Sequence, residues 1–321
     1  MSRIRPQRRT EFYRRAPRVA LQSEKIELKT PYFAGAKILI AYIVASSFAS
    51  SASALDTAKL NEAVRIEEAR LQARVGMAVF NATTGKTWRY RGDERFPLNS
   101  THKTFACAAL LAKVDGKSLS LDREVSIRRE MLLPYSPIVE KAPLPHTMTL
   151  GKICHASVSY SDNAAANIVL DAIGGPNGFT AYMQSIGDET TRLDRKEPEL
   201  NAATPGDLRD TTTPNAIVAS LRKVLLGEAL SASSRRELTQ WMLDDKVADA
   251  LLRASLPADW KIADKTGAGG YGSRSIVAVI WPPAQLPLVV GVYITQTQAS
   301  MQESNRAIAT IGAALKDALG L

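Results

Sequence analysis

The chain of 321 residues is long enough to bury a substantial hydrophobic core, as one large domain or two modest ones. Its net charge of +9 is concentrated at the start, because residues 1–54 hold ten Lys or Arg and three Asp or Glu, which leaves only +2 for the rest. A basic excess confined to a leader does not indicate nucleic-acid binding, so we expect no nucleic-acid partner.

Residues 1–54 have the organisation of an export signal. Arginines crowd residues 3–18, an apolar run over 38–45 follows Lys37, and Ala52-Ser53-Ala54 is a small-x-small cleavage pattern. The apolar run is too short to span a bilayer comfortably. We therefore predict a signal peptide over 1–54, a periplasmic or secreted mature protein, and no stable membrane association after cleavage. An uncleaved anchor is the alternative.

The remaining chain begins and ends with strand patterns and is mostly helical between them. An amphipathic helix over 57–72 precedes a hairpin of two strands, 74–81 and 87–91. An apolar helix starts near Phe105, and the stretch to about 242 is expected to be largely helical. The clearest helices there cover 150–157, 163–172, 178–186, 213–226 and 231–243. Strands rich in β-branched residues follow over 260–265, 275–281 and 288–296, and a helix over 301–319 closes the chain.

This order predicts an antiparallel sheet shared by the two ends of the chain, covered by helices, with a helical domain inserted. We assign residues 55–91 and 243–321 to an α/β domain and residues 92–242 to the helical domain. A cleft between the two bodies is the expected place for a functional site.

The two cysteines, Cys107 and Cys154, lie in segments predicted to be buried and helical. In an exported protein such a pair is a disulfide candidate, with two free buried thiols as the alternative. The three histidines are scattered, and no His-x-His or Cys-x-x-Cys spacing exists, so we expect no metal and no other cofactor. So few histidines also give poor support to a Ser-His-Asp triad.

Ser100 and Lys103 lie at the start of the apolar helix, three residues apart and therefore on one face of it. A lysine crowded by apolar groups has a lowered pKa and can take the proton of a serine hydroxyl. Alone the pattern is common, and a helix-capping serine with a solvated lysine is the ordinary alternative. His102, between them, is expected to pack or cap.

Three further stretches join this pair: Ser161-Asp162-Asn163, Glu197-Pro198-Glu199-Leu200-Asn201, and Lys265-Thr266-Gly267 at a predicted strand end. Each alone could be a helix cap, a solvated loop or a turn. Together, in this order, they resemble the class A serine β-lactamases over essentially the whole mature chain. The run Gly267 to Gly272 and the cysteine pair resemble the carbenicillin-hydrolysing branch, which usually carries Arg where this chain has Lys265.

The resemblance implies an α+β fold: a five-stranded antiparallel sheet flanked by helices, with an inserted all-α domain. It also implies that Ser100 is acylated by the β-lactam carbonyl, with either Lys103 or Glu197 (through a water) as the base. Backbone N–H groups of Ser100 and Ala268 would hold the negative oxygen. Ser161 would relay a proton to the departing nitrogen, beside the positive charge of Lys265.

Other residues receive binding or structural roles from the same resemblance. Glu197, with Asn201, would steer the water that releases the acyl group, in a loop closed by Arg195 and Asp210 and containing a cis Glu197–Pro198 bond. Glu199 would be structural. The substrate is expected to meet Tyr135, Asn163, Asn201, Thr266, Gly267 and Arg274, the last because an arginine fork suits a carboxylate.

Two other functions share part of this pattern. A D-alanyl-D-alanine peptidase has the Ser-Lys, Ser-x-Asn and Lys-Thr-Gly parts but generally lacks the Glu197 loop. A non-hydrolytic β-lactam sensor needs an anchor and a signalling domain.

Asn99 and Gly269 are not cysteines, so the disulfide of several carbapenem-hydrolysing relatives is absent. We therefore predict a monomeric enzyme for penicillins, including carboxypenicillins, over extended cephalosporins and carbapenems.

Overall fold

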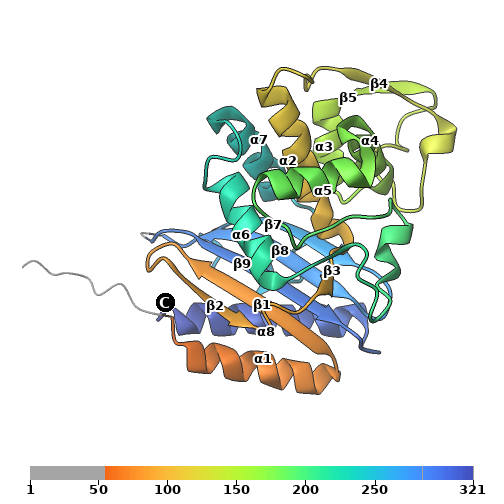
Figure 1. Ribbon diagram of the computed structural model, residues 1–321. Helices are drawn as coiled ribbons and strands as arrows, with labels where there is room; N and C mark the ends of the chain where they lie inside the picture. Colours follow the sequence, from red (N-terminus) through yellow and green to blue (C-terminus); the bar gives the residue numbers. More distant parts are fainter. Residues whose placement is uncertain (1–54, 284, 321) are drawn as a thin grey trace, which may run out of the picture. The chain divides into compact units, whose positions relative to one another are not determined.

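A five-stranded antiparallel sheet in the order β2-β1-β9-β8-β7 forms the lower half of the molecule in Figure 1. The computed structural model describes residues 55–283 and 285–320, so the predicted signal peptide lies outside the described residues. The strands are β1 (Arg74–Asn81), β2 (Lys86–Tyr90), β7 (Lys261–Ala268), β8 (Arg274–Trp281) and β9 (Leu288–Thr295). β8 and β9 are almost continuously apolar, because helices cover both faces of the sheet.

The outer face of the sheet is covered by α1 (Thr57–Leu71) and α8 (Met301–Ala318), which lie side by side beneath it in Figure 1. Leu60, Val64, Ile308 and Ile311 from these helices are fully buried in a cluster with the strands. α8 begins with a capping box, in which Ser300 and Glu303 satisfy each other's backbone N–H groups.

The inner face supports the helical half through α6 (Pro214–Leu225). α2 (His102–Asp115) is the central helix, with every residue from 102 to 111 buried. The helices α3 (Leu150–Ser159), α4 (Asn163–Ile173), α5 (Gly175–Ser185) and α7 (Ala232–Leu243) pack around it. The burial of the run from Phe105 to Leu111 agrees with its sequence, which has apolar or small residues on every side.

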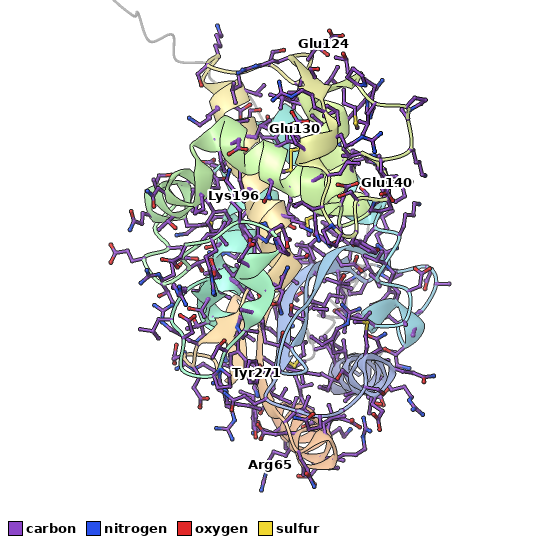
Figure 2. The ribbon with its side chains drawn as sticks, turned by 90° about the vertical axis from the view of Figure 1, so that its right-hand side faces the viewer. Arg65, Glu124, Glu130, Glu140, Lys196 and Tyr271 are labelled. Atoms are coloured by element: carbon purple, nitrogen blue, oxygen red, sulfur yellow. A yellow bond between two sulfur atoms is a disulfide. The ribbon has the colours of Figure 1, made fainter. Side chains whose placement is uncertain are left out.

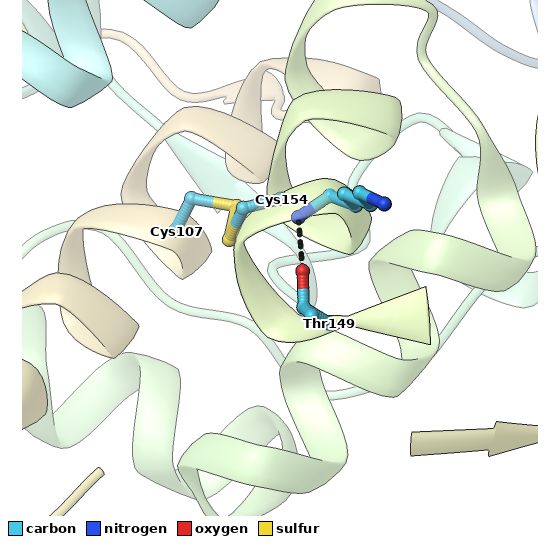
Figure 3. The surroundings of a disulfide bond; sticks show 4 residues. Cys107, Thr149 and Cys154 are labelled. Carbon is cyan, nitrogen blue, oxygen red and sulfur yellow. Dashed lines mark hydrogen bonds between the residues drawn. A yellow bond between two sulfur atoms is a disulfide. The ribbon is translucent and has the colours of Figure 1, made fainter. Parts of the chain in front are cut away.

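A disulfide joins Cys107 of α2 to Cys154 of α3, as expected from the pair of cysteines (Figure 3). The start of α3 is fixed beside it, because the Thr149 hydroxyl accepts a hydrogen bond from the Lys152 N–H at 3.3 Å. The two cysteines are therefore bridged in this structure, and the helix that carries Lys103 is tied covalently to its neighbour.

The middle of the chain is less uniformly helical than predicted. Two small sheets interrupt it: β3 (Phe96–Pro97) pairs with β6 (Thr211–Thr212), and β4 (Glu124–Ile127) pairs with β5 (His146–Thr149). Short 3₁₀ turns also occur: η1 (Asn99–Thr101), η2 (Arg129–Met131), η3 (Glu199–Ala202) and η4 (Leu252–Ala254). Segments of two to four residues are too short to show a period, so the sequence pattern missed them.

The predicted architecture of a five-stranded antiparallel sheet flanked by helices is confirmed. The predicted bounds differ in several places. The difference that affects the motifs is at β7, which continues to Ala268, so Lys265-Thr266-Gly267 lies within the strand instead of at its end. The described residues form one compact unit, and the division into domains at residues 92 and 242 stays a prediction. Within residues 55–283 and 285–320, no helix is both long and apolar enough to cross a membrane.

Candidate active site

Ser100 lies in the 3₁₀ turn η1, immediately before α2, and is 9% exposed. β7 passes directly against this turn at Gly267. A Cβ atom on Gly267 would lie 3.1 Å from the Ser100 nitrogen and 2.5 Å from the Ser275 hydroxyl, so only glycine fits. The close approach places the backbone of Gly267 against the Ser100 nitrogen.

Lys103, which belongs to the Ser100 motif, is fully buried. Its amine contacts residues of two other motifs, Ser161-Asp162-Asn163 and the Glu197 loop. Its Nζ donates to the Ser161 carbonyl at 2.8 Å and to Asn163 Oδ1 at 2.6 Å, and it lies 3.4 Å from the Ser161 hydroxyl. The Glu197 carboxylate lies 3.0 Å from the same nitrogen. Burial lowers the pKa of Lys103, while the charge of Glu197 opposes that shift.

Glu197 is 2% exposed and is held at its backbone as well as its carboxylate. The Asn167 amide clamps the peptide, donating to the Glu197 carbonyl at 2.8 Å and accepting from its N–H at 2.9 Å. Asn201 donates a hydrogen bond to the carboxylate. Burial acts to raise the pKa of Glu197, but the positive charge of Lys103 and the hydrogen bonds from Lys103 and Asn201 leave it below its ordinary value.

The loop that carries Glu197 is closed by Arg195 and Asp210, and we call residues 195–210 the Ω loop. Arg195 Nε donates to Asp210 Oδ2 at 2.5 Å. The other oxygen of Asp210 accepts the N–H groups of Asp194 and Arg195 at 2.7 and 2.9 Å. The Glu197–Pro198 bond is cis, as expected. In Figure 2, Lys196 of this loop lies at a height between Glu124 of the helical half and Tyr271 of the β7–β8 turn.

Positive charge gathers at the β7 end of the site. Lys265 is fully buried, and burial lowers its pKa to about 8, although Asp245 acts in the opposite direction. Arg274 donates to Asn305 Oδ1 at 2.7 Å and to the Gly267 carbonyl at 3.0 Å. Burial lowers the pKa of Arg274 to about 10, so it stays charged at neutral pH.

These groups surround a cleft of about 320 Å³. It is lined by Ser100, Tyr135, Ser161, Asn163, Asn201, Val247, Thr266, Gly267, Ala268, Arg274 and Met301. Lys103, Glu197 and Lys265 are buried behind this lining. The structure therefore brings the predicted reactive and binding residues together around one opening, while Arg195 and Asp210 hold the loop beside it.

Three non-glycine residues at the cleft have left-handed backbones: Asn99 (φ 46°), Tyr135 (φ 62°) and Ser161 (φ 58°). Such residues are strained and persist where the surroundings fix them. At Ser161 the fixing group is the buried neighbour Asp162, whose carboxylate accepts the N–H groups of Ile138, Val139 and Ala165.

Several site residues were missed from the sequence. Asn167 lies one turn after Asn163 on α4, a spacing that could have indicated it. Val247 and Met301 line the cleft from segments with no motif. Asn305 orients Arg274 from α8, 31 residues away in the chain, and no local pattern predicts that contact.

The fold and this cleft define a serine hydrolase of the acyl-transfer type. A family model described as the beta-lactamase enzyme family matches residues 57–319. The chain is 71% identical over 297 residues to beta-lactamase AER-1 of Aeromonas hydrophila, covering 92% of this chain and 98% of that protein. It is 45% identical to beta-lactamase PSE-4 of Pseudomonas aeruginosa, covering 88% and 97%.

Solved structures agree with these relatives. An ancestral (GNCA) class A beta-lactamase is 49% identical with a TM-score of 0.79, covering 81% of this chain and 99% of that chain. The chromosome-encoded beta-lactamase of Vibrio parahaemolyticus is 44% identical with a TM-score of 0.78, covering 80% and 98%. The chain belongs to the class A β-lactamases, and the family predicted from its motifs is confirmed.

Proposed function

We propose that this protein hydrolyses the β-lactam amide of penicillins through an acyl-enzyme on Ser100, released by a water that Glu197 activates. The observation that carries the proposal is the placement of Glu197: buried, clamped by Asn167 and 3.0 Å from the Lys103 amine. A sensor that keeps its acyl group needs no such base, and the D-alanyl-D-alanine peptidases generally lack this loop. A β-lactamase, in contrast, must aim a base at a water beside the acyl-enzyme ester.

In the acylation step, the Ser100 oxygen attacks the carbonyl carbon and the ring C–N bond breaks. The coupled Lys103–Glu197 pair takes the serine proton, and Ser161, 3.4 Å from Lys103 Nζ, passes a proton to the departing nitrogen. The N–H groups of Ser100 and Ala268 stabilise the negative oxygen, a contribution typically worth about 10²–10³ in rate.

In the release step, Glu197 takes a proton from water as the water oxygen attacks the ester carbonyl. The Ser100 oxygen then leaves and recovers a proton through Lys103. The lowered pKa of Glu197 keeps the carboxylate ionised at neutral pH, as a base requires. Asn201, which donates a hydrogen bond to the Glu197 carboxylate, orients both the carboxylate and the water.

The substrate carboxylate binds at the positive end of the cleft, against Thr266, Lys265 and Arg274. Asn163 donates to the acylamino side chain at the other end, Tyr135 covers the mouth, and Gly267 lets the substrate approach β7.

Because Asn99 and Gly269 are not cysteines, we propose penicillins, including carboxypenicillins, as better substrates than extended cephalosporins and carbapenems. Steady-state kinetics with benzylpenicillin, carbenicillin, cefotaxime and imipenem test that order, which comparable turnover of imipenem and benzylpenicillin would contradict.

We also propose that the mature protein is an exported monomer without stable membrane association. The support is the arginine-rich leader, its short apolar run and the cleavage pattern at residues 52–54. Cell fractionation with N-terminal sequencing, followed by sedimentation of the purified mature protein, tests each part.

The decisive experiment for the function is the Glu197→Ala variant treated with benzylpenicillin. We expect rapid acylation of Ser100 and then a stalled acyl-enzyme, seen by intact-mass spectrometry as a persistent adduct. Glu199→Ala is the matched control, because Glu199 is an exposed carboxylate two residues away in the same loop. That control should turn over like the original chain.

Two outcomes would overturn the proposal. One is an E197A variant that accumulates no adduct yet has lost hydrolysis. The other is an original chain that cleaves D-alanyl-D-alanine peptides faster than it hydrolyses benzylpenicillin, which would favour the peptidase.

A further inference from the structure

Asn99, the residue before Ser100, joins the turn that carries Ser100 to the hairpin turn between β7 and β8. It is fully buried, and its Nδ2 donates a hydrogen bond to the Ser273 hydroxyl at 3.0 Å, across 174 positions of the chain. Ser273 is 4% exposed, so the bond lies where water competes little and where it is electrostatically stronger than in solvent. The bond therefore links η1 directly to the end of the sheet beside the cleft.

Ser273 is itself held in a tight turn. Its N–H donates to the Gly270 carbonyl at 3.0 Å, and its carbonyl accepts the Gly269 N–H at 3.1 Å. The Gly270 N–H donates in turn to the Asn201 carbonyl of the Ω loop at 2.8 Å. The hydroxyl that Asn99 contacts therefore belongs to a piece of backbone that other hydrogen bonds already fix.

The backbone conformation of Asn99 does not account for its amide. The φ angle of 46° lies in the left-handed region, which asparagine tolerates better than most residues but which glycine adopts at no steric cost. A Cβ atom on Gly267 would lie 3.0 Å from the Asn99 Cβ, so β7 passes as close to this side chain as a glycine allows. A side chain here therefore needs a reason beyond the turn, and its bond to Ser273 supplies one.

We propose that Asn99 is a positioning residue whose amide, through Ser273, holds the Ser100 turn against β7. This link fixes the spacing of the two N–H groups, of Ser100 and Ala268, that receive the negative oxygen. The inference rests on the proposed function, which assigns that role to the two groups. Ser100 follows Asn99 directly, and Ala268 ends β7 five residues before Ser273, so each donor lies near one end of the link. Donors act only if they are in place before the charge develops, and a misplacement of about 1 Å can cost about 10²-fold in rate.

The test is the Asn99→Gly variant, which removes the amide and leaves a backbone that adopts the left-handed turn freely. We expect the rate constant for acylation by benzylpenicillin, measured in a single turnover by quenched flow and intact-mass spectrometry, to fall about tenfold. The dissociation constant of benzylpenicillin should change by less than about twofold, because the negative oxygen exists only in the transition state. Phenylboronic acid, which forms a negatively charged tetrahedral adduct on Ser100, should bind about tenfold more weakly.

Ser273→Ala removes the other end of the link and should slow acylation by a similar factor. The double variant N99G/S273A should be no slower than the slower single variant, because two groups that act through one bond do not have additive effects. Ser275→Ala is the matched control. Ser275 is a buried serine two residues further along, and its hydroxyl has no hydrogen-bond partner among the described residues. The control should acylate at the original rate.

Three results would overturn the proposal. They are an N99G variant that acylates as fast as the original chain, fully additive losses in the double variant, and an equal loss in the control. If N99G folds poorly, the S273A variant and its control carry the same test. The proposed function fails by a different result, an original chain that forms no Ser100 adduct with benzylpenicillin.

Discussion

Lys265 is the residue whose ionisation should limit the enzyme in alkali. Burial lowers its pKa to about 8, so it is charged at neutral pH and neutral well above that value, while the substrate carboxylate stays charged. We predict that KM for benzylpenicillin rises about tenfold between pH 7 and pH 9.5, with a smaller change in kcat.

The matched variant is Lys265→Arg, which keeps a positive charge over this range. Its KM should vary much less with pH, and an equally steep rise in both proteins would assign the alkaline limb to another group.

Residues were predictable where the chemistry needs them at a fixed spacing. Ser100 and Lys103 lie three residues apart, and Glu197 and Asn201 lie four residues apart, so the motifs that predicted them are local. Asn167 and Asn305 were missed because each acts on a residue about 30 positions away and is itself an ordinary helix amide. His102 was expected to pack or cap and is fully buried, but no local pattern predicts that its Nε2 has no hydrogen-bond partner among the described residues.

The Ω loop is an element with no regular structure except a single 3₁₀ turn, so its anchors decide its shape. Asp210 is 1% exposed, and removing its partner would leave a buried charge unpaired, which typically costs about 3–5 kcal/mol. We predict that Arg195→Ala lowers the melting temperature and slows acyl-enzyme release. Thermal unfolding and the lifetime of the adduct are the measurements.

Arg192→Ala is the control for the Ω loop. Arg192 pairs with Asp194 at the edge of the same loop but is 46% exposed, and exposed pairs contribute little. This variant should keep both properties near their original values. Equal losses in the two variants would mean that the Arg195–Asp210 pair has no special part in closing the loop.

Elements were predictable in proportion to their length. The eight-residue strand β1 and the long helices α1 and α8 fall within a residue or two of their expected bounds, because a full period is visible in each. The pairs β3–β6 and β4–β5 form only because distant segments meet, and neither β3 nor β6 has more than two residues. A short stretch of sequence therefore cannot predict that these strands pair.

At the scale of the whole molecule, the helical half and the sheet share one core. Phe105 and Leu110 from α2 belong to the same buried cluster as Val277 and Val289 from β8 and β9. A continuous core makes separate unfolding of the two halves costly, so we expect one cooperative transition. The disulfide lies within this core and stabilises the molecule as a whole.

Replacing Cys107 and Cys154 by serine should therefore lower the stability of the entire described chain. The bridge closes a loop of 47 residues, and restricting the unfolded chain over that length is worth about 4 kcal/mol in the chain-entropy view. We predict a lower melting temperature for the double variant, with near- and far-ultraviolet circular dichroism changing together. The original chain under reducing conditions should approach the same value. Two thiols found in the denatured, unreduced original chain, or a melting temperature unaffected by reduction, would contradict this account.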